Sequence, residues 1–509
     1  MLFHSKEFLF FFLPIVYIGT VLLTRIKPIA AVLWLAIASL VFYAFGEVAE
    51  IGITGFEFGH LALILFSIIF NYQLGKRLSA NNRNKKCKLV FGITVNLLLL
   101  GYFKYADLMV STLYSMWGGI FNGFGIKLPL AISFFTFQQI AFLVDISIGR
   151  FTIPRFKDYL LFVGFFPQLI AGPIVKCQQI VPQLKSGNLG RPNQAMIWTG
   201  LCLFAIGVTK KSEFADGIRP LADDAFRAVS EGQILSFAEA WCGAVAFGFQ
   251  VYFDFSAYSD IAIGLGLLFG LKLPINFNSP YQATSIIDFW RRWHITLSEF
   301  LRDYLYIPLG GNRRGMVHAM ANVMIVMLIG GLWHGASWNF MIWGGLHGAL
   351  IASNHLIRSK FSTPEFNSIS LRAVTQTLFT FFIVTLAWTF FRSPDLADSI
   401  SMVKSMLGFH GIDLPRSIPV SDTGYFRSSG MFSNEVLNKA LFPLLVVLGL
   451  LSWLAPNSQK IVGMDLTKPC EPNPKVPKKK VLFYSGCLLF FGLKSTFETV
   501  SFDYLYFRF

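Results

Sequence analysis

The most constraining feature of this chain is an apolar stretch from Gly315 to Ile357 that contains no Asp, Glu, Lys or Arg. Basic residues flank it, with Arg313 and Arg314 before it and Arg358 after it. A helix that crosses a bilayer needs about 20 apolar residues, so this stretch is long enough to enter the membrane and return. The positive-inside rule places both basic flanks in the cytoplasm, which requires an even number of crossings or a re-entrant path.

The rest of the chain has the same apolar character. Hydrophobic residues make up 54% of its 509 residues and charged residues only 14%, whereas about 25% charged residues is usual in a soluble protein. This composition predicts a multi-spanning helical membrane protein. Apolar segments lie at 8–23, 29–46, 58–74, 89–111, 129–149, 157–175, 195–209, 237–271, 319–357, 371–392, 440–455 and 481–499.

We expect an all-α polytopic fold with about 10 to 12 transmembrane helices, some of them re-entrant, in a single domain over 1–509. The segment 237–271 is too long for one span. Arg25 and Lys27 follow the first apolar run. We interpret that run as an uncleaved first span whose N-terminus lies outside, because basic residues favour the cytoplasmic side.

Three polar stretches interrupt the apolar pattern. The acidic connection 47–57 and the loop 393–437 are expected outside, and the Pro/Lys-rich linker 457–480 in the cytoplasm. The net charge of +15 arises from 43 Lys and Arg against 28 Asp and Glu. These basic residues lie mostly in short connections between spans, so we expect no nucleic-acid partner. The cysteines are scattered, without a Cys-x-x-Cys pair, so neither a zinc site nor a disulfide framework is predicted.

The densest group of charges lies in FWRRWHITLSEFLRDYLYIPLGGNRRG, residues 289–315. Ser285, with Asp288 three residues later, is a helix-start signal. A helical period from that point predicts one amphipathic helix whose charges pair at i,i+3 and i,i+4. His294 falls at the edge of its apolar face. Two interpretations stay open, an interfacial helix with a structural histidine and a helix that lines a polar cavity with His294 facing inward.

A second histidine, His334, stands in GGLWHGASW, residues 330–338. The glycines loosen the helix at this point, and either basic flank lies about 20 residues away, or about 30 Å along a helix. His334 is therefore expected deep in the bilayer or near its outer face, where an ionisable group indicates function. The alternative is a neutral imidazole bound to a carbonyl that the glycines free. His347 and His355 are interpreted as structural.

Two carboxylates, Asp254 and Asp260, lie in the apolar sequence QVYFDFSAYSDIAIGLG, residues 250–266. At such depth they are expected to line a cavity or to accept hydrogen bonds from neighbouring hydroxyl groups. Three further side chains are expected to line a polar cavity, namely Ser298, Trp333 and Asn339. No metal site is predicted. The run GLGLLFG is not a dinucleotide site, because no strand precedes it.

Taken together, these clusters resemble the membrane-bound O-acyltransferase family, and more narrowly its bacterial alginate O-acetylation branch, with the teichoic acid D-alanylation proteins as cousins. The resemblance covers nearly the whole chain and is strongest over 90–360. Ala131 and Ala257 stand where the family pattern has Gly. Supporting stretches are GYFKYAD (101–107), PLAISFFTFQQIAFLVD (129–145), FFPQLIAGPIVK (165–176), NFNSPY (276–281) and YLYFRF (504–509).

The resemblance implies a ring of membrane helices around a thinned centre, where a cytoplasmic and a periplasmic funnel meet. It makes His334 the near-universal family histidine, expected to be the catalytic base, and His294 the second histidine of the bacterial branch. The donor is expected to be acetyl-coenzyme A, with no permanently bound cofactor. Contacts to its phosphates are expected from Arg291, Arg292, Arg313 and Arg314.

The function implied by the resemblance is acetylation of an exported polysaccharide, such as alginate, cellulose, another exopolysaccharide or peptidoglycan. The protein would lie among the lipids of a bacterial inner membrane, with a periplasmic SGNH-type acetyltransferase as partner. One alternative within the family is a D-alanyl, lipid or protein O-acyltransferase. An alternative of another class is an ion-coupled transporter that uses Asp254, Asp260 and the histidines as an ion path.

Overall fold

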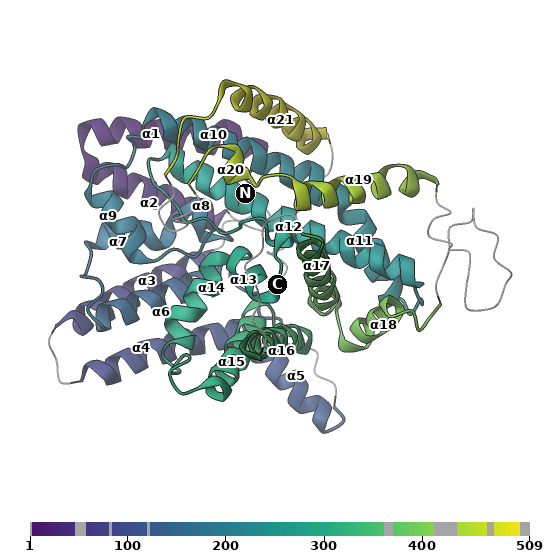
Figure 1. The fold of residues 1–509 in the computed structure, drawn as a ribbon. Coiled ribbons are helices and arrows are strands. Elements are labelled where there is room, and N and C mark those ends of the chain that lie inside the picture. Colours follow the sequence, from purple (N-terminus) through teal and green to yellow (C-terminus); the bar gives the residue numbers. More distant parts are fainter. Residues whose placement is uncertain are drawn as a thin grey trace. The chain divides into compact units, whose positions relative to one another are not determined.

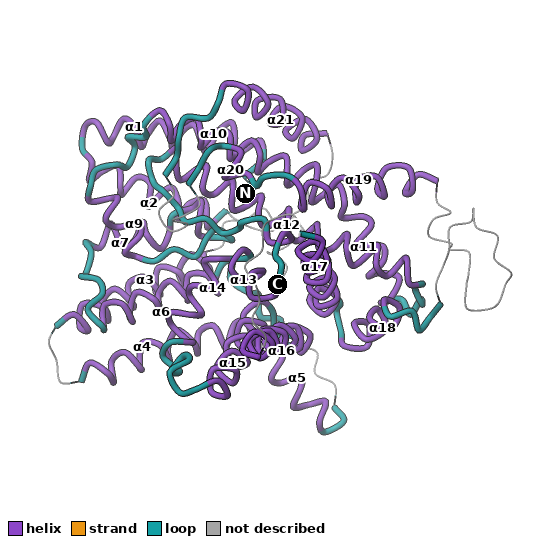
Figure 2. The backbone as a smooth tube through the Cα atoms, viewed as in Figure 1, coloured by secondary structure: helices purple, strands orange, loops and turns teal. Residues whose placement is uncertain are grey.

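The fold is taken from a computed structural model, which describes residues 3–45, 58–80, 84–119, 123–360, 370–411, 435–465 and 473–498. Over these residues the chain is helical, without β-strands (Figure 2). The acidic connection 47–57, the greater part of the loop 393–437 and the C-terminal stretch 504–509 lie outside them. An all-α polytopic membrane fold is therefore confirmed.

The described part of the chain contains six helices that are long and apolar enough to cross a membrane, and three shorter apolar helices. By length and composition alone this is fewer than the 10 to 12 spans expected from the sequence. The six are 8–26, 58–79, 85–116, 237–268, 316–334 and 371–392.

The chain forms two compact units. The first comprises 1–209, 255–276 and 458–509, and the second comprises 210–254 and 277–457. The units alternate along the sequence because helix α12, Phe237–Leu268, contributes its first part to the second unit and its last part to the first.

The first unit is built mainly from the N-terminal helices (Figure 1). Helix α1 packs against α2, α3 and α4 against α6, and α10 against α21. Their bounds are α1 Leu13–Ile26, α2 Pro28–Ala44, α3 Phe58–Ser79, α4 Lys85–Leu100, α5 Ala106–Met116, α6 Ile132–Ser147, α7 Phe156–Gly164, α8 Phe166–Leu169, α9 Cys177–Lys185, α10 Gln194–Thr209, α20 Ser458–Ile461 and α21 Lys479–Glu498. Short π-helical turns precede α1 and α5, at Phe8–Phe12 and Gly101–Tyr105.

Two expectations for the apolar segments need correction. The segment 157–175 is not one helix, because α7 ends at Gly164 and the short α8 begins at Phe166, with Pro167 in its first turn. Conversely, 237–271, which we expected to be too long for one span, contains the single helix α12. Almost all of the apolar part of α12 is buried inside the protein, so the thickness of the bilayer does not limit its length.

The second unit contains the histidines singled out in the sequence. Its elements are the π-helix η4 Lys210–Ala215, α11 Asp216–Ser230, the first part of α12, η5 Pro280–Gln282, α13 Ile286–Arg292, α14 Ile295–Leu301, η6 Arg302–Tyr306, α15 Met316–His334, α16 Trp338–Lys360, α17 Leu371–Arg392, α18 Leu396–Met406 and α19 Glu435–Leu454. Helix α16 packs against α15, α13 and α17, so the site is assembled around it (Figure 1).

The uncharged stretch 315–357 folds as the helical hairpin of α15 and α16, which turns at Gly335–Ser337. Glycine is required where the two backbones meet. A Cβ atom at Gly331 would overlap the Phe340 carbonyl group, and one at Gly344 would overlap the Met327 carbonyl group. The helix is interrupted within GGLWHGASW, between the end of α15 at His334 and the start of α16 at Trp338.

Candidate functional site

His294 and His334, which are 40 positions apart, lie side by side in the second unit. Their ring centroids are 6.4 Å apart, and both side chains are buried. His294 precedes the first residue of α14, and His334 is the last residue of α15. Two imidazoles from separate elements therefore meet inside the protein.

The backbone at His294 departs from the helix that the sequence predicts. The start signal is present, since the Asp288 amide donates to Ser285 Oγ at 3.2 Å. However, α13 ends at Arg292, and His294 adopts a left-handed conformation with φ 42° and ψ 55°. The expectation of one continuous amphipathic helix is therefore wrong. The break turns His294 inward, and α14 begins after it.

Packing at Trp293 accounts for this break. Its ring lies 5.1 Å from that of Phe277 and 5.0 Å from that of Trp388. Left-handed backbone costs a non-glycine residue about 1–2 kcal/mol. Among the residues that the structure describes, only three non-glycine residues have a positive φ, Ala131, Ser279 and His294. Strain of this kind at a buried histidine is characteristic of functional sites.

Aromatic rings surround His334. Its imidazole centroid lies 5.0 Å from Trp333, 5.1 Å from Trp343 and 5.3 Å from Phe391. Trp343 comes from α16 and Phe391 from the last turn of α17. His334 is therefore held inside the protein and does not face lipid.

His347 belongs to the wall of the same aromatic cluster. The indole NH of Trp290 donates to His347 Nδ1 at 3.3 Å, and Trp343 lies 4.7 Å from the His347 ring. His355, two turns further along α16, is exposed. These positions fit the structural role that we expected for both.

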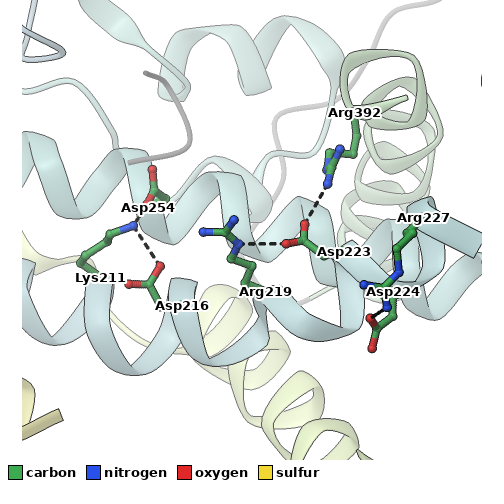
Figure 3. A network of polar contacts seen from close by, with 8 residues as sticks. All are labelled: Lys211, Asp216, Arg219, Asp223, Asp224, Arg227, Asp254 and Arg392. Atoms are coloured by element: carbon green, nitrogen blue, oxygen red, sulfur yellow. Dashed lines mark hydrogen bonds and ion pairs between the residues drawn. The ribbon is translucent and has the colours of Figure 1, made fainter. Parts of the chain in front are cut away.

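Asp254 belongs to a buried ion-pair network in the second unit. Its carboxylate is 2.8 Å from the ammonium group of Lys211, which is also 2.9 Å from Asp216 Oδ1 (Figure 3). The Lys211 side chain is only 1% exposed. The sequence pattern did not identify Lys211, although a lysine two residues after the apolar helix α10 and five residues before an aspartate is a usable signal for a buried ion pair.

The charged cluster continues along α11. Asp223 accepts hydrogen bonds from Arg219 Nε at 2.9 Å and from Arg392 Nη2 at 2.8 Å (Figure 3). Because Arg392 is the last residue of α17, this aspartate ties the end of α17 to α11. Arg392 was not among the predicted site residues either.

Asp260 lies in the first unit and is satisfied differently. It accepts hydrogen bonds from Ser458 Oγ at 2.5 Å and Gln459 Nε2 at 2.7 Å. These partners are one hydroxyl and one amide group that lie 198 and 199 residues further along the chain, not hydroxyl groups that neighbour Asp260 in the sequence. Since Asp254 and Asp260 belong to different units, we treat them as separate features.

The remaining polar candidates are also placed. Trp333 and Asn339 are buried, and Ser298 is half-buried with its hydroxyl donating to the Trp290 carbonyl at 3.2 Å. The Asn339 side-chain NH₂ donates to the Ser393 carbonyl at 3.0 Å. Trp333 directly precedes His334, Asn339 lies in the first turn of α16, and Ser298 lies one turn after His294 on α14.

Known proteins that resemble this chain point to one family. Residues 149–393 match the MBOAT, membrane-bound O-acyltransferase family. A peptidoglycan O-acetyltransferase of Helicobacter pylori is 41% identical over 443 residues, which cover 81% of each chain. A "probable alginate O-acetylase" of Pseudomonas aeruginosa is 38% identical over 425 residues, 80% of this chain and 75% of that one.

This chain is a member of the membrane-bound O-acyltransferase family. A teichoic acid D-alanyltransferase of Bacillus subtilis is a more distant relative, at 26% identity over 231 residues, 44% of this chain and 58% of that one. The transferase is thus a multi-pass membrane enzyme of the acyltransferase class. His294 and His334 both fall within the matched family region.

The four arginines proposed for the donor phosphates lie in two places on this acyltransferase. Arg291 and Arg292 end α13, two residues before His294, whereas Arg313 and Arg314 are exposed in the turn before α15. Arg292 is already paired, since its Nε donates to Asp288 Oδ1 at 3.0 Å. That pair is one of the i,i+4 pairs predicted from the sequence.

A cavity of about 380 Å³ lies between α16 and α17 of the transferase. It is lined largely by apolar groups, and none of the predicted site residues lines it. Among the residues with described positions, no cluster of three or more His, Cys, Asp or Glu could hold a metal ion.

Proposed function

We propose that this membrane O-acyltransferase takes an acetyl group from cytoplasmic acetyl-coenzyme A and passes it across the bacterial inner membrane to an exported polysaccharide. The observation that carries the proposal is the pair of buried imidazoles, 6.4 Å apart, in the second unit. The two relatives with the highest coverage described above act, by name, on peptidoglycan and alginate. Both acceptors offer sugar hydroxyl groups.

In this proposal His334 is the general base. It takes the proton of an attacking hydroxyl group while the oxygen forms a bond with the carbonyl carbon of the thioester. The carbon–sulfur bond breaks, and the proton leaves with the coenzyme A thiolate as the free thiol. A base of this kind typically contributes about 10²- to 10⁴-fold to the rate.

His294 has a different role in the proposal. It lies outside the candidate spans, and burial lowers the pKa of its imidazole to about 3. A group with that pKa is neutral near pH 7 and poorly matched to proton abstraction. Its neutral ring keeps one N–H donor, so His294 is the residue that orients and polarises the acyl carbonyl group.

The proposal also covers the donor contacts, the orientation in the membrane and the partner protein. Arg291, Arg292, Arg313 and Arg314 contact the donor phosphates, for which guanidinium groups have suitable geometry. The N-terminus lies on the periplasmic side, in agreement with the positive-inside rule. A periplasmic SGNH-type acetyltransferase completes the transfer to the polysaccharide.

The test uses membranes from cells that express the full chain, supplied with radiolabelled acetyl-coenzyme A. His334→Ala and His294→Ala are expected to reduce labelled polysaccharide by at least about 10²-fold. The matched control is His355→Ala, an exposed histidine of the same hairpin, which is expected to retain wild-type labelling. Undiminished labelling by both site variants, at equal protein levels, would refute the assigned roles.

An assay with the same membranes distinguishes which acyl donor the enzyme uses. Labelled D-alanyl carrier protein is offered in place of acetyl-coenzyme A. Labelling from the carrier alone would contradict the acetyl assignment and favour D-alanyl transfer.

A further inference from the structure

The cavity of about 380 Å³ between α16 and α17 has the size of a ligand site, since such sites commonly occupy about 300–1,000 Å³. Its walls come from the last turns of α16, the first half of α17 and the residues that begin α13 (Figure 1). All of them belong to the second unit. The lining residues that carry the argument are Ser285, Leu350, Asn354, Ile357, Gln376 and Phe379.

The mouth of this cavity is open to lipid. Two of its lining residues, Ile357 and Phe379, are 54% and 66% exposed. Phe379 belongs to α17, which is long and apolar enough to span a membrane, so its exposed ring faces acyl chains. A hydrocarbon chain can therefore enter between α16 and α17 from the bilayer.

Polar groups inside the cavity are available to a ligand. Asn354 Oδ1 is buried and has no hydrogen bond among the residues that the structure describes. Buried polar atoms almost always have a partner, so this oxygen indicates a ligand with an N–H or O–H donor. Ser285, which is 8% exposed, accepts hydrogen bonds from the Asp288 amide at 3.2 Å and from Arg358 Nη2 at 3.0 Å. Its hydroxyl group still has a proton to donate.

Two exposed arginines stand at one end of the cavity. Arg358 follows Asn354 by one turn on α16, and Arg372 precedes Gln376 by one turn on α17. Residues four apart share a helix face, and the bond from Arg358 to Ser285 holds its guanidinium group at the cavity wall. Because α16 ends at Lys360 and α17 begins at Leu371, both arginines lie at the end where the chain connects the two helices.

The charge around the cavity is positive. Neither α16 nor α17 contains Asp or Glu, and none of the described residues that line the cavity is charged. Asp288, whose amide contacts Ser285, has its carboxylate paired with Arg292 at 3.0 Å. An apolar cavity with a basic rim between membrane helices complements an anionic lipid headgroup and its acyl chain.

We propose that this cavity binds one phospholipid whose anionic headgroup carries a hydroxyl group, as in phosphatidylglycerol. One acyl chain lies against Leu350 and Phe379. The phosphate binds Arg358 and Arg372, whose guanidinium groups suit its geometry, and the headgroup hydroxyl donates to Asn354 Oδ1. The bound lipid ties α16 to α17, and the inference does not depend on which acyl group the enzyme transfers.

The experiment uses the full chain, purified in detergent and titrated with phosphatidylglycerol that carries a photoactivatable acyl chain. This lipid is expected to raise the melting temperature in a saturable manner, because a ligand that binds only the folded state stabilises it. After illumination, crosslinks are expected within 350–357 of α16 and 376–383 of α17. Phosphatidylcholine with the same chains should bind at least about 10-fold more weakly, because it has no net negative charge and no headgroup hydroxyl.

Matched variants separate the headgroup contacts from the chain contacts. Arg358→Gln and Arg372→Gln are each expected to raise the half-saturating lipid concentration about 5-fold. Asn354→Leu, which removes one hydrogen bond, should raise it about 2- to 10-fold. Leu350→Trp fills the cavity and should abolish the crosslinks without unfolding the protein. The control Arg77→Gln alters an exposed arginine in the last turn of α3 and is expected to change neither the half-saturating concentration nor the crosslinks.

The contrary results are distinct from a failure of the proposed function, since neither readout involves acyl transfer. Equal binding of phosphatidylcholine and phosphatidylglycerol, or crosslinks confined to other helices, would overturn the inference. An effect of Arg77→Gln as large as that of Arg358→Gln would do the same, because it would mean that only general surface charge attracts the lipid. Glycerol 3-phosphate and acetyl-coenzyme A are added as competitors. If either displaces the crosslinked lipid, the cavity binds a soluble phosphate compound and the lipid assignment is wrong.

Discussion

Removal of the Lys211 ammonium group tests how the second unit tolerates its buried charges. In Lys211→Met the side chain keeps nearly the same length but loses its charge. Asp254, with 4% of its side chain exposed, and Asp216, with 15%, then lose the cation that lies 2.8 and 2.9 Å from them. Two carboxylates would remain close together in a region that water barely reaches.

The expected cost follows from this burial. Breaking a buried ion pair by removing one partner typically costs about 3–5 kcal/mol, because the remaining charge is uncompensated. For a unit of roughly 200 residues, each kcal/mol shifts the melting temperature by about 2–4 °C. Lys211→Met should therefore melt roughly 6–20 °C below the wild type. The double variant Lys211→Met/Asp254→Asn should recover more than half of the lost melting temperature, because it also removes the charge of Asp254, the more buried of the two aspartates.

The assay is thermal unfolding of the purified protein in detergent, followed by tryptophan fluorescence. Arg227→Met serves as the control, because it breaks an ion pair whose arginine is 65% exposed, and such surface pairs contribute only about 0–1 kcal/mol. The reasoning is refuted if Lys211→Met melts within about 2 °C of the wild type, or if the double variant melts below the single one.

Three further predictions concern the backbone and pH. Ala131 begins α6 with φ 60°, so Ala131→Gly should stabilise the protein by about 0.5–1 kcal/mol; a lower melting temperature would contradict this. Gly344→Ala should abolish folding of the α15–α16 hairpin and with it acyl transfer, because the added Cβ would overlap the Met327 carbonyl group. The control Gly345→Ala should preserve both, since its added Cβ would lie 3.4 Å from Leu328. Equal acyl-transfer activities of the two variants would contradict this prediction. Burial, opposed by Lys211 and reinforced by Asp254, raises the pKa of Asp216 from 3.8 to about 6. The folded state then retains a proton that the unfolded state releases, so this contribution to stability is present below pH 4 and is lost between about pH 4 and 6; melting curves over that range should show a slope that Asp216→Asn reduces.

Many of the helices could be predicted from the sequence. The bilayer requires a membrane helix to have a certain apolar length and favours basic residues at its cytoplasmic end, and both features can be read from the sequence. The segment 371–392 is a helix with those same bounds, and the start of α13 follows the Ser285 signal. These features depend on local chemistry alone. The same is true of the end of α15 within GGLWHGASW, where Gly335 follows the last helical residue.

The failures arise where tertiary packing overrides local pattern. A helical period continues through Trp293 and His294, but contacts of Trp293 with Phe277 and Trp388 break the helix there. Lys211 was missed because its partners are 5 and 43 residues away and only the folded chain brings them together. The juxtaposition of Asn339 with Ser393, 54 residues apart, was inaccessible for the same reason.

The hydrogen bonds of Asp260 have a consequence for biosynthesis. Its partners Ser458 and Gln459 lie 198 and 199 residues further along the chain. At about 5–20 residues per second, a ribosome needs at least about 10 s to synthesise that interval. During this delay the Ser458 and Gln459 side chains that bind Asp260 have not yet been synthesised, so the first unit cannot close until almost the entire polypeptide has been translated.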